Sequence, residues 1–181
     1  MSRWIAAALV GNEGDEAAVE WAATEAAPGD EIRIVCPVPA HASAVTSWPV
    51  ADEDDIAHVH ARQRIDDAID AVRRIRPPVV VSGSIVFGPS SVILGETVQS
   101  VDLLVLADDP WLTHPVVRAA VCPVVVLPPS ADAFDIASAP IALLVDGSSL
   151  PTDAVQFAFE IAARRGTSLV VANTDDANGS L

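Results

Sequence analysis

Short runs of apolar residues alternate with longer segments of helical periodicity along most of this sequence, and this alternation constrains the fold more than any other feature. Five runs are predicted strands, at residues 5–10, 31–37, 79–86, 102–107 and 122–127. Several of these runs are apolar at nearly every position, which is typical of strands with helices on both faces of a parallel sheet. The pattern therefore predicts an α/β fold.

Four helices are predicted between these strands, at residues 15–27, 54–75, 90–100 and 114–121. The second shows the clearest stripe, with apolar residues at Ala61, Ile65, Ala68, Ile69 and Val72. Strict alternation of five strands and four helices indicates an open, doubly wound, Rossmann-like domain with a five-stranded parallel sheet, over residues 1–128.

A second, incomplete unit follows this domain. Prolines bracket residues 129–139, which read as a linker, and residues 140–173 read as β-α-β, with strands at 141–145 and 167–172. Its helix carries the stripe Ala154, Phe157, Ala158, Ile161 and Ala162, and residues 174–181 read as a frayed tail. The unit resembles the start of the chain, so it is a partial second repeat. A lone β-α-β has open strand edges, and we expect it to lie against the first domain or another copy of the chain.

Composition excludes several functional classes. The net charge is −15 and the pI is near 4.3, so the surface repels phosphate, and we expect neither nucleic acid nor a membrane as a partner. Every basic residue is arginine and there is no tyrosine, which excludes Schiff-base lysine and tyrosine acid/base chemistry. Cys36 and Cys122 stand in separate apolar runs, so we expect two buried free thiols in a reducing cytoplasm.

No catalytic or metal site is expected. Asp108 and Asp109 could hold magnesium or calcium, but adjacent carboxylates on a loop are more often solvated. The serines near strand ends lack a G-x-S-x-G elbow and suit helix capping. No zinc-ligand spacing occurs among the four histidines, which are His41, His58, His60 and His114.

Two tryptophans lie in loops and have two interpretations each. Trp48 is in the long 37–55 loop, which is either an insertion whose acids cap the next helix or an arm that binds a partner through Trp48. Trp111 either fills a pocket or lies at an interface.

Several segments in their order and spacing resemble the universal stress protein family. They are Val19-Glu20-Trp21-Ala22, Gly88-Pro89 with Val92-Ile93, the apolar runs 101–106 and 122–127, and Val145-Asp146-Gly147-Ser148. The resemblance covers residues 4–127 and begins again over 140–172. It implies a fold of the adenine nucleotide alpha hydrolase type, a cytoplasmic location, a role in the stress response and a homodimer, which in this family often pairs through the last strand, here residues 122–127.

The family's ATP-binding members have an acid after the first strand and a loop G-x2-G-x9-G-S/T after the fourth. Here Val10 stands at the acid position and the loop from Ala107 to Pro115 has no glycine, so the resemblance implies that ATP binding is lost and that no cofactor is held. If a small molecule binds, the candidate pocket residues are Gly11, Asn12, Ala107 and Asp108, with Asp146 of the later repeat. We therefore expect a non-enzymatic protein that acts by association; the alternative is a binding module for a nucleotide or another small molecule with a non-standard pocket.

Overall fold

The computed structural model describes residues 2–39, 53–128, 139–145 and 152–173. The chain divides into two compact units, Met1–Ala133 and Phe134–Leu181. The division falls inside the segment predicted as a linker, most of which lies outside the described residues. Each unit is therefore described by itself.

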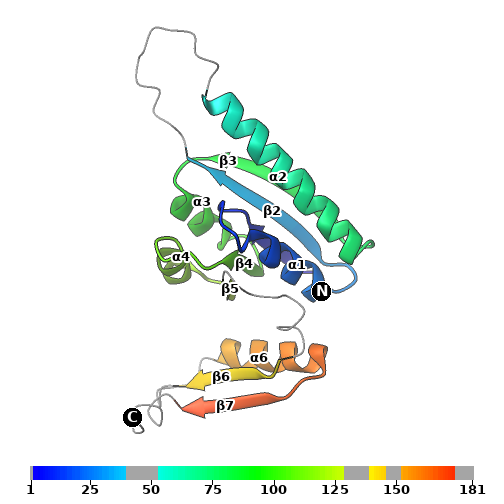
Figure 1. Cartoon of the computed structure of the whole chain (residues 1–181). Helices are drawn as coiled ribbons and strands as arrows, with labels where there is room; N and C mark the ends of the chain where they lie inside the picture. The colour runs from blue at the N-terminus through cyan, green and yellow to red at the C-terminus, as the bar shows by residue number, and fades with distance from the viewer. Residues whose placement is uncertain (1, 40–52, 129–138, 146–151, 174–181) are drawn as a thin grey trace. The chain divides into compact units, whose positions relative to one another are not determined.

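The first unit contains a five-stranded parallel sheet in the order β3-β2-β1-β4-β5, which confirms the predicted doubly wound α/β fold (Figure 1). The order of elements follows the predicted alternation. The bounds are β1 Trp4–Ala8, α1 Asp15–Glu25, β2 Glu31–Val38, α2 Glu53–Ile75, β3 Val80–Phe87, α3 Ser90–Thr97, β4 Leu103–Ala107, α4 Thr113–Ala119 and β5 Val124–Leu127.

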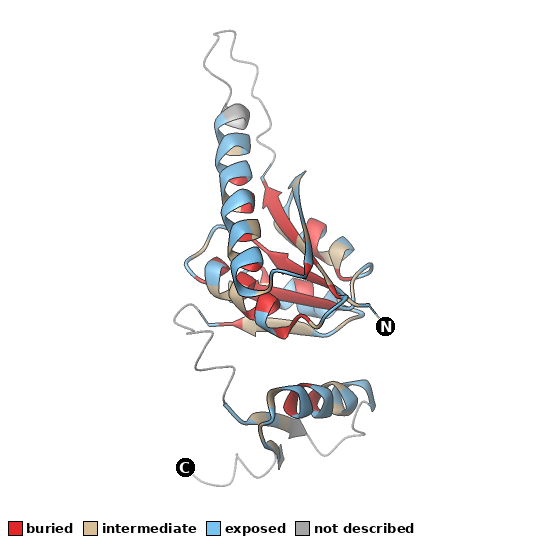
Figure 2. Cartoon of the chain, turned by 90° about the vertical axis from the view of Figure 1, so that its right-hand side faces the viewer, coloured by how far each residue is buried: buried red, intermediate tan, exposed pale blue. Residues whose placement is uncertain are grey.

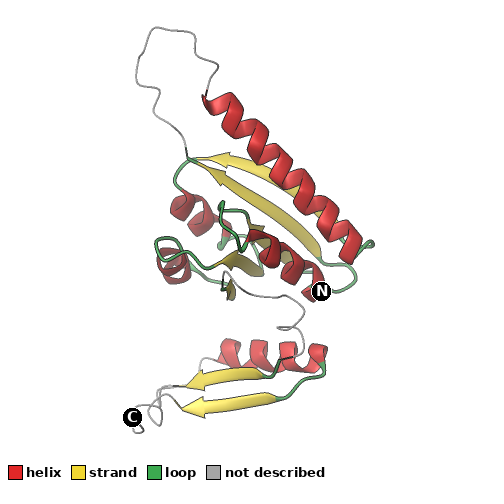
Figure 3. Ribbon diagram, viewed as in Figure 1, coloured by secondary structure: helices red, strands yellow, loops and turns green. Residues whose placement is uncertain are grey.

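Helices cover both faces of this sheet, α1 and α2 on one face and α3 and α4 on the other (Figure 3). The core under α3 and α4 contains residues of alternate positions on β1 and β4, which are Ala6, Ala8, Leu104 and Leu106. On the other face the predicted α2 stripe is largely buried, since Ala61, Ile65, Ala68 and Val72 are all buried. The central strands β1 and β4 are therefore the most buried of the sheet.

Helix α3 ends at Thr97, three residues before its predicted end. Strand β3 lies at the edge of the sheet and has no buried residue, although five of its eight residues are apolar. The last strand starts at Val124 rather than at 122, and Cys122 is half-buried rather than buried as predicted. Cys36 is a fully buried free thiol.

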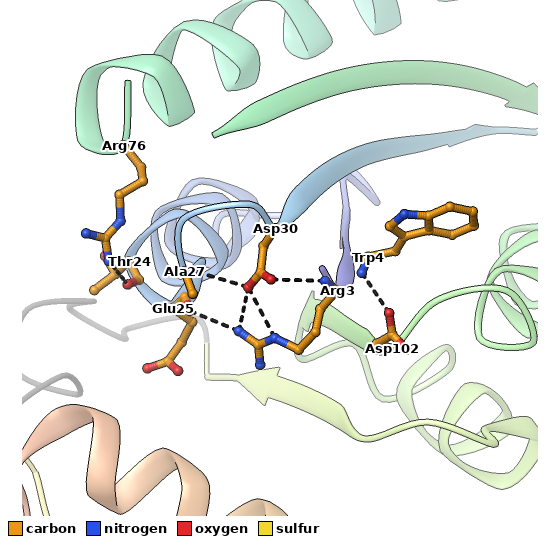
Figure 4. A network of polar contacts seen from close by, with 8 residues as sticks. All are labelled: Arg3, Trp4, Thr24, Glu25, Ala27, Asp30, Arg76 and Asp102. Carbon is orange, nitrogen blue, oxygen red and sulfur yellow. Dashed lines mark hydrogen bonds and ion pairs between the residues drawn. The ribbon is translucent and has the colours of Figure 1, made fainter. Parts of the chain in front are cut away.

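A polar cluster stabilises the amino-terminal ends of the strands (Figure 4). The Asp30 carboxylate accepts hydrogen bonds from the Arg3 backbone N–H at 3.0 Å, from its guanidinium at 2.7 and 3.1 Å, and from the Ala27 N–H at 3.0 Å. Asp102 accepts from the Trp4 N–H at 2.7 Å and so joins the starts of β1 and β4. Burial alone would raise the pKa of Asp30, but the Arg3 and backbone hydrogen bonds lower it overall.

The second unit consists of β6 Ile141–Val145, α6 Thr152–Arg165 and β7 Leu169–Asn173, with β6 and β7 paired in parallel. Ala158, Ile161 and Ala162 of the predicted stripe are buried, whereas Ala154, near the start of α6, is exposed. Val170 and Val171 are 50% and 58% exposed. The two strands and one helix thus leave apolar surface uncovered within this unit.

Candidate functional site

The predicted pocket residues of the first unit lie together at the carboxyl ends of β1 and β4. Gly11 and Asn12 follow β1, Ala107 ends β4, and Asp108 comes next. The Asn12 side-chain amide donates to the Asp108 backbone carbonyl at 3.4 Å, which directly links the two loops. Asp146, the fifth predicted residue, lies outside the described residues.

The start of α1 packs tightly against the end of β4 at this crevice. A Cβ atom at Gly14 would stand only 2.7 Å from the Ala107 Cβ, so the glycine is needed for this approach. Ala107 is fully buried, and Gly14 is buried too. The backbone that leads into α1 therefore lies directly against the end of β4.

Asp15, which the sequence analysis missed, holds the loop after β1. Its carboxylate accepts hydrogen bonds from the N–H groups of Val10 at 3.1 Å and Gly11 at 2.8 Å, and it forms an ion pair with Arg64 of α2. The second guanidinium nitrogen of Arg64 lies 3.7 Å from the Cys36 sulfur. Burial raises the pKa of the Cys36 thiol, and the nearby Arg64 charge only partly opposes the increase. This cluster ties β1, β2, α1 and α2 together.

One sequence signal could have indicated this cluster. Arg64 stands beside Ala61, Ile65 and Ala68 on the buried stripe of α2, and an arginine at such a position needs an acidic partner. The first acid at the start of the neighbouring helix is Asp15.

The loop after β4 satisfies its own backbone donors. The Asp109 carboxylate accepts from the N–H groups of Trp111 at 2.9 Å and Leu112 at 3.1 Å, and the Thr113 hydroxyl donates to Asp108 at 2.9 Å. Asp108 is exposed, as expected of a loop carboxylate, whereas Asp109 is partly buried and bound to backbone amides, so the expectation that it is solvated is wrong. Asp109 occupies the amides with which a phosphate could hydrogen-bond at this turn, and its negative charge opposes an anion there.

Trp111 is 90% exposed, so it does not fill a pocket. This observation removes one of the two interpretations of that residue and leaves an interface role open. Trp48, the other loop tryptophan, lies outside the described residues.

A more open groove runs between α1 and α2, beside the Asp15 and Arg64 pair. Its volume is about 500 Å³. Its floor contains Leu9, Val19 and Ala68, and its rim carries Glu16, Asp67 and Arg74. The groove thus combines a small apolar floor with charges of both signs, and it is more polar than most small-molecule sites.

Two further features are absent from the described residues. No group of three or more His, Cys, Asp or Glu side chains there could hold a metal ion. None of the helices described is long and apolar enough to cross a membrane.

Solved structures with the same fold identify the architecture. A universal stress protein family member from Burkholderia pseudomallei has 22% sequence identity and a TM-score of 0.56, covering 70% of this chain and 96% of its own. The first unit has the fold of the universal stress proteins.

Two further structures with this universal stress protein fold contain a nucleotide. The Archaeoglobus fulgidus protein, in complex with dAMP, has 15% identity and a TM-score of 0.52, and the match covers 70% of this chain and 97% of that one. The Arabidopsis thaliana protein, with AMP bound, has 17% identity and a TM-score of 0.55, covering 72% and 94%. No family model matches this chain, and no curated protein matches it significantly.

Proposed function

We propose that this chain is a non-enzymatic universal-stress-like protein that acts in the stress response by association with itself or another protein, and that its first unit does not bind ATP. The observation that carries the proposal is the loop after β4. There the Asp109 carboxylate accepts from two backbone amides, at Trp111 and Leu112, and no glycine is present in the loop. A triphosphate would have to displace the Asp109 carboxylate from these amides. It would then lie beside the negative charges of Asp108 and Asp109.

The tight contact between Gly14 and Ala107 supports the same proposal, because it narrows the crevice where a doubly wound sheet ordinarily binds its ligand. Association, in contrast, needs only free strand edges and exposed apolar side chains, and the unit has both. We propose a homodimer in the cytoplasm as the working form, with β5 as the edge expected from the resemblance.

Thermal unfolding with and without millimolar ATP and magnesium tests the ATP part of this proposal. We expect no change in Tm relative to magnesium alone, and no nucleotide released from the purified protein in mass spectrometry. If ATP bound, a concentration of one hundred times its Kd would stabilise the folded protein by about 2.7 kcal/mol, which is readily measured. Such an increase, or ATP carried through purification, would refute the proposal.

The second candidate function is a binding module for a nucleotide or another small molecule with a non-standard pocket. The groove of about 500 Å³ between α1 and α2 favours it, as do the AMP and dAMP complexes of the two relatives in fold. The same assay with AMP and cyclic AMP distinguishes it from the first candidate. If stabilisation by AMP is lost in Arg74→Gln, at the exposed rim, and kept in Arg62→Gln, outside the groove lining, the groove is the site.

A further inference from the structure

An open recess lies on the α3 side of the sheet, the face opposite the groove between α1 and α2. It is formed by β2, β3 and the segment that leads from the end of α3 to β4, and its volume is about 270 Å³. Figure 2 shows the contrast between the buried strand β2 and the mostly exposed strand β3 beside it. Most small-molecule pockets have volumes of about 300–1,000 Å³, so a ligand of this recess must be small.

The pairing of β2 with β3 places three polar side chains together on this face. Arg33 pairs with Ser82, and Val35 pairs with Ser84, in the parallel register of the two strands. Val35 belongs to the core under α3 and α4. Because alternate residues of a strand share a face, Arg33, Ser82 and Ser84 lie on the same side of the sheet as Val35. The floor of the recess is therefore polar, although both strands are largely apolar in sequence.

The Arg33 side chain is fixed at this recess while part of its hydrogen-bonding capacity is unused. It is 34% exposed, its Cζ lies 3.7 Å from the centre of the Trp4 ring, and its Nε–H donates to the Glu31 carboxylate at 3.4 Å. The two terminal guanidinium nitrogens have no hydrogen-bond partner among the described residues. Their N–H groups therefore remain available to donate to a ligand.

The hydroxyl groups of the recess differ in what they can still do. The Thr97 hydroxyl donates to the Ile93 carbonyl at 2.8 Å, and the Ser100 hydroxyl donates to the Thr97 carbonyl at 3.1 Å. Both protons are in use, so these two oxygens can only accept from a ligand. The hydroxyls of Ser82 and Ser84 have no partner among the residues that the structure describes, so they can donate or accept. The recess thus offers donors on its strand side and acceptors on its α3 side.

Charge and hydrogen bonding together determine which ligand fits. A carboxylate could accept from Arg33 but could not donate to Thr97 or Ser100, and the net charge of −15 repels it. An ammonium group could donate to the α3 side but could not accept from Arg33, and the guanidinium charge repels it. A hydroxyl group both donates and accepts and carries no charge, so it suits both sides of the recess.

We propose that this recess binds a neutral ligand with several hydroxyl groups, of the size of a single sugar ring. Arg33 and Ser82 donate to its hydroxyl oxygens, and its own hydroxyl groups donate to Thr97 and Ser100. Val86 and Val101, which also line the recess, supply apolar surface for the C–H groups of the ring. This inference goes beyond the proposed function, and the site is separate from both the crevice at β1 and β4 and the groove between α1 and α2.

Amide NMR spectra of the full-length chain test the site with glucose, galactose and mannose as probes. We expect at least one of these hexoses, at millimolar concentration, to shift the backbone signals of Ser82, Ser84 and Ser100. The indole N–H signal of Trp4 should move with them, because Arg33 lies on its ring. Each hexose is compared with its uronic acid, which keeps the ring and adds a carboxylate. The uronic acid should bind at least about tenfold more weakly, because the charge of the protein repels it.

Two variants identify the residues that hold the sugar. Arg33→Gln should weaken binding at least about tenfold and Ser82→Ala about threefold, because a charged and a neutral hydrogen-bond donor are lost. Arg73→Gln, in an exposed pair on α2, and Ser91→Ala, exposed on α3, lie outside the recess lining and should not change the affinity. Ser82 is exposed, so its variant should remain folded, and an unchanged circular dichroism spectrum would show this. Three outcomes overturn the inference: no shift at the recess with any of the three hexoses, tighter binding of a uronic acid than of its hexose, or unchanged affinity in both recess variants.

Discussion

Gly83 of β3 is needed because α2 packs directly on the strand, and replacing it with alanine tests this packing. A Cβ atom there would overlap the Cγ2 methyl group of Ile65 and would lie 3.4 Å from Cδ1 of Ile69. Restoring an ordinary carbon separation of about 3.5–4.0 Å would require α2 to move by about 1 Å or more. Such overpacking costs about 1–3 kcal/mol, and the lower entropy of an unfolded alanine chain offsets about 0.4–1 kcal/mol of it.

We therefore expect Gly83→Ala to lower the free energy of unfolding by about 1–2 kcal/mol. Urea denaturation followed by tryptophan fluorescence measures this change in the first unit alone, because all four tryptophans precede residue 134. Ser84→Ala, whose side chain lies on the opposite face, is the control and should change stability by no more than about 0.5 kcal/mol.

A double-mutant cycle identifies the contact responsible. Ile65→Ala alone should cost about 2–5 kcal/mol, and Gly83→Ala should cost less in that background because the overlapping methyl group is gone. A neutral Gly83→Ala, or a cost that is the same with and without the Ile65 side chain, would show that this contact does not limit the packing.

Three further predictions concern charge, capping and thiols. Asp30→Asn should destabilise the first unit by about 3 kcal/mol near neutral pH, whereas Asp70→Asn, in an exposed pair, should have almost no effect in the same urea titration. Because the pKa of Asp30 is lowered in the folded state, its contribution to the free energy of unfolding should be complete above a pH of about 4. The contribution should disappear as the pH falls through the folded-state pKa. A difference in unfolding free energy between wild type and Asp30→Asn that is constant with pH would contradict this. Asp109→Ala should cost about 1 kcal/mol and Asp109→Asn much less, because the asparagine side chain still caps the turn before α4. Burial raises the pKa of both Cys36 and Cys122, so at neutral pH a thiol reagent should modify Cys36 only after unfolding and Cys122 more slowly than a free thiol; rapid labelling of native Cys36 would contradict the structure.

The fold could be predicted from the sequence because its apolar periods are strong and regular. The exposure of β3 could not be predicted in the same way. Its apolar residues predict a covered strand, but β3 is an edge strand and α3 packs on β1 and β4 instead. The early end of α3 was not predictable either. Val98, just beyond α3, is fully buried against the core, and the Gln99 side chain donates to the Ala119 carbonyl at 2.8 Å. These are tertiary contacts, and local helix propensity does not report them.

The position of the candidate site could be predicted from the sequence, but most of the contacts within it could not. The carboxyl ends of β1 and β4 follow from the strand order, and Gly11, Asn12, Ala107 and Asp108 lie there as expected. The capping role of Asp109 could have been inferred from Pro110 after it, since proline suits the first position of a helical turn. Arg64 on the buried stripe of α2 signals that an acidic partner exists, but identifying Asp15 as that partner requires the packing of α1 against α2.

The position of β1 in the sheet has a consequence for synthesis of the chain. β1 leaves the ribosome before the other four strands of its sheet and lies at the centre of that sheet, yet its partner β4 comes almost one hundred residues later. The hydrogen bond from Trp4 to Asp102 joins residues 98 positions apart. At about 5–20 residues per second, β1 has an open side for several seconds or more, even after β2 has paired with it. A nascent chain in that interval exposes one side of a strand that is almost completely buried in the finished sheet. Chaperone binding during translation should therefore persist until β4 emerges, well before the second unit is made.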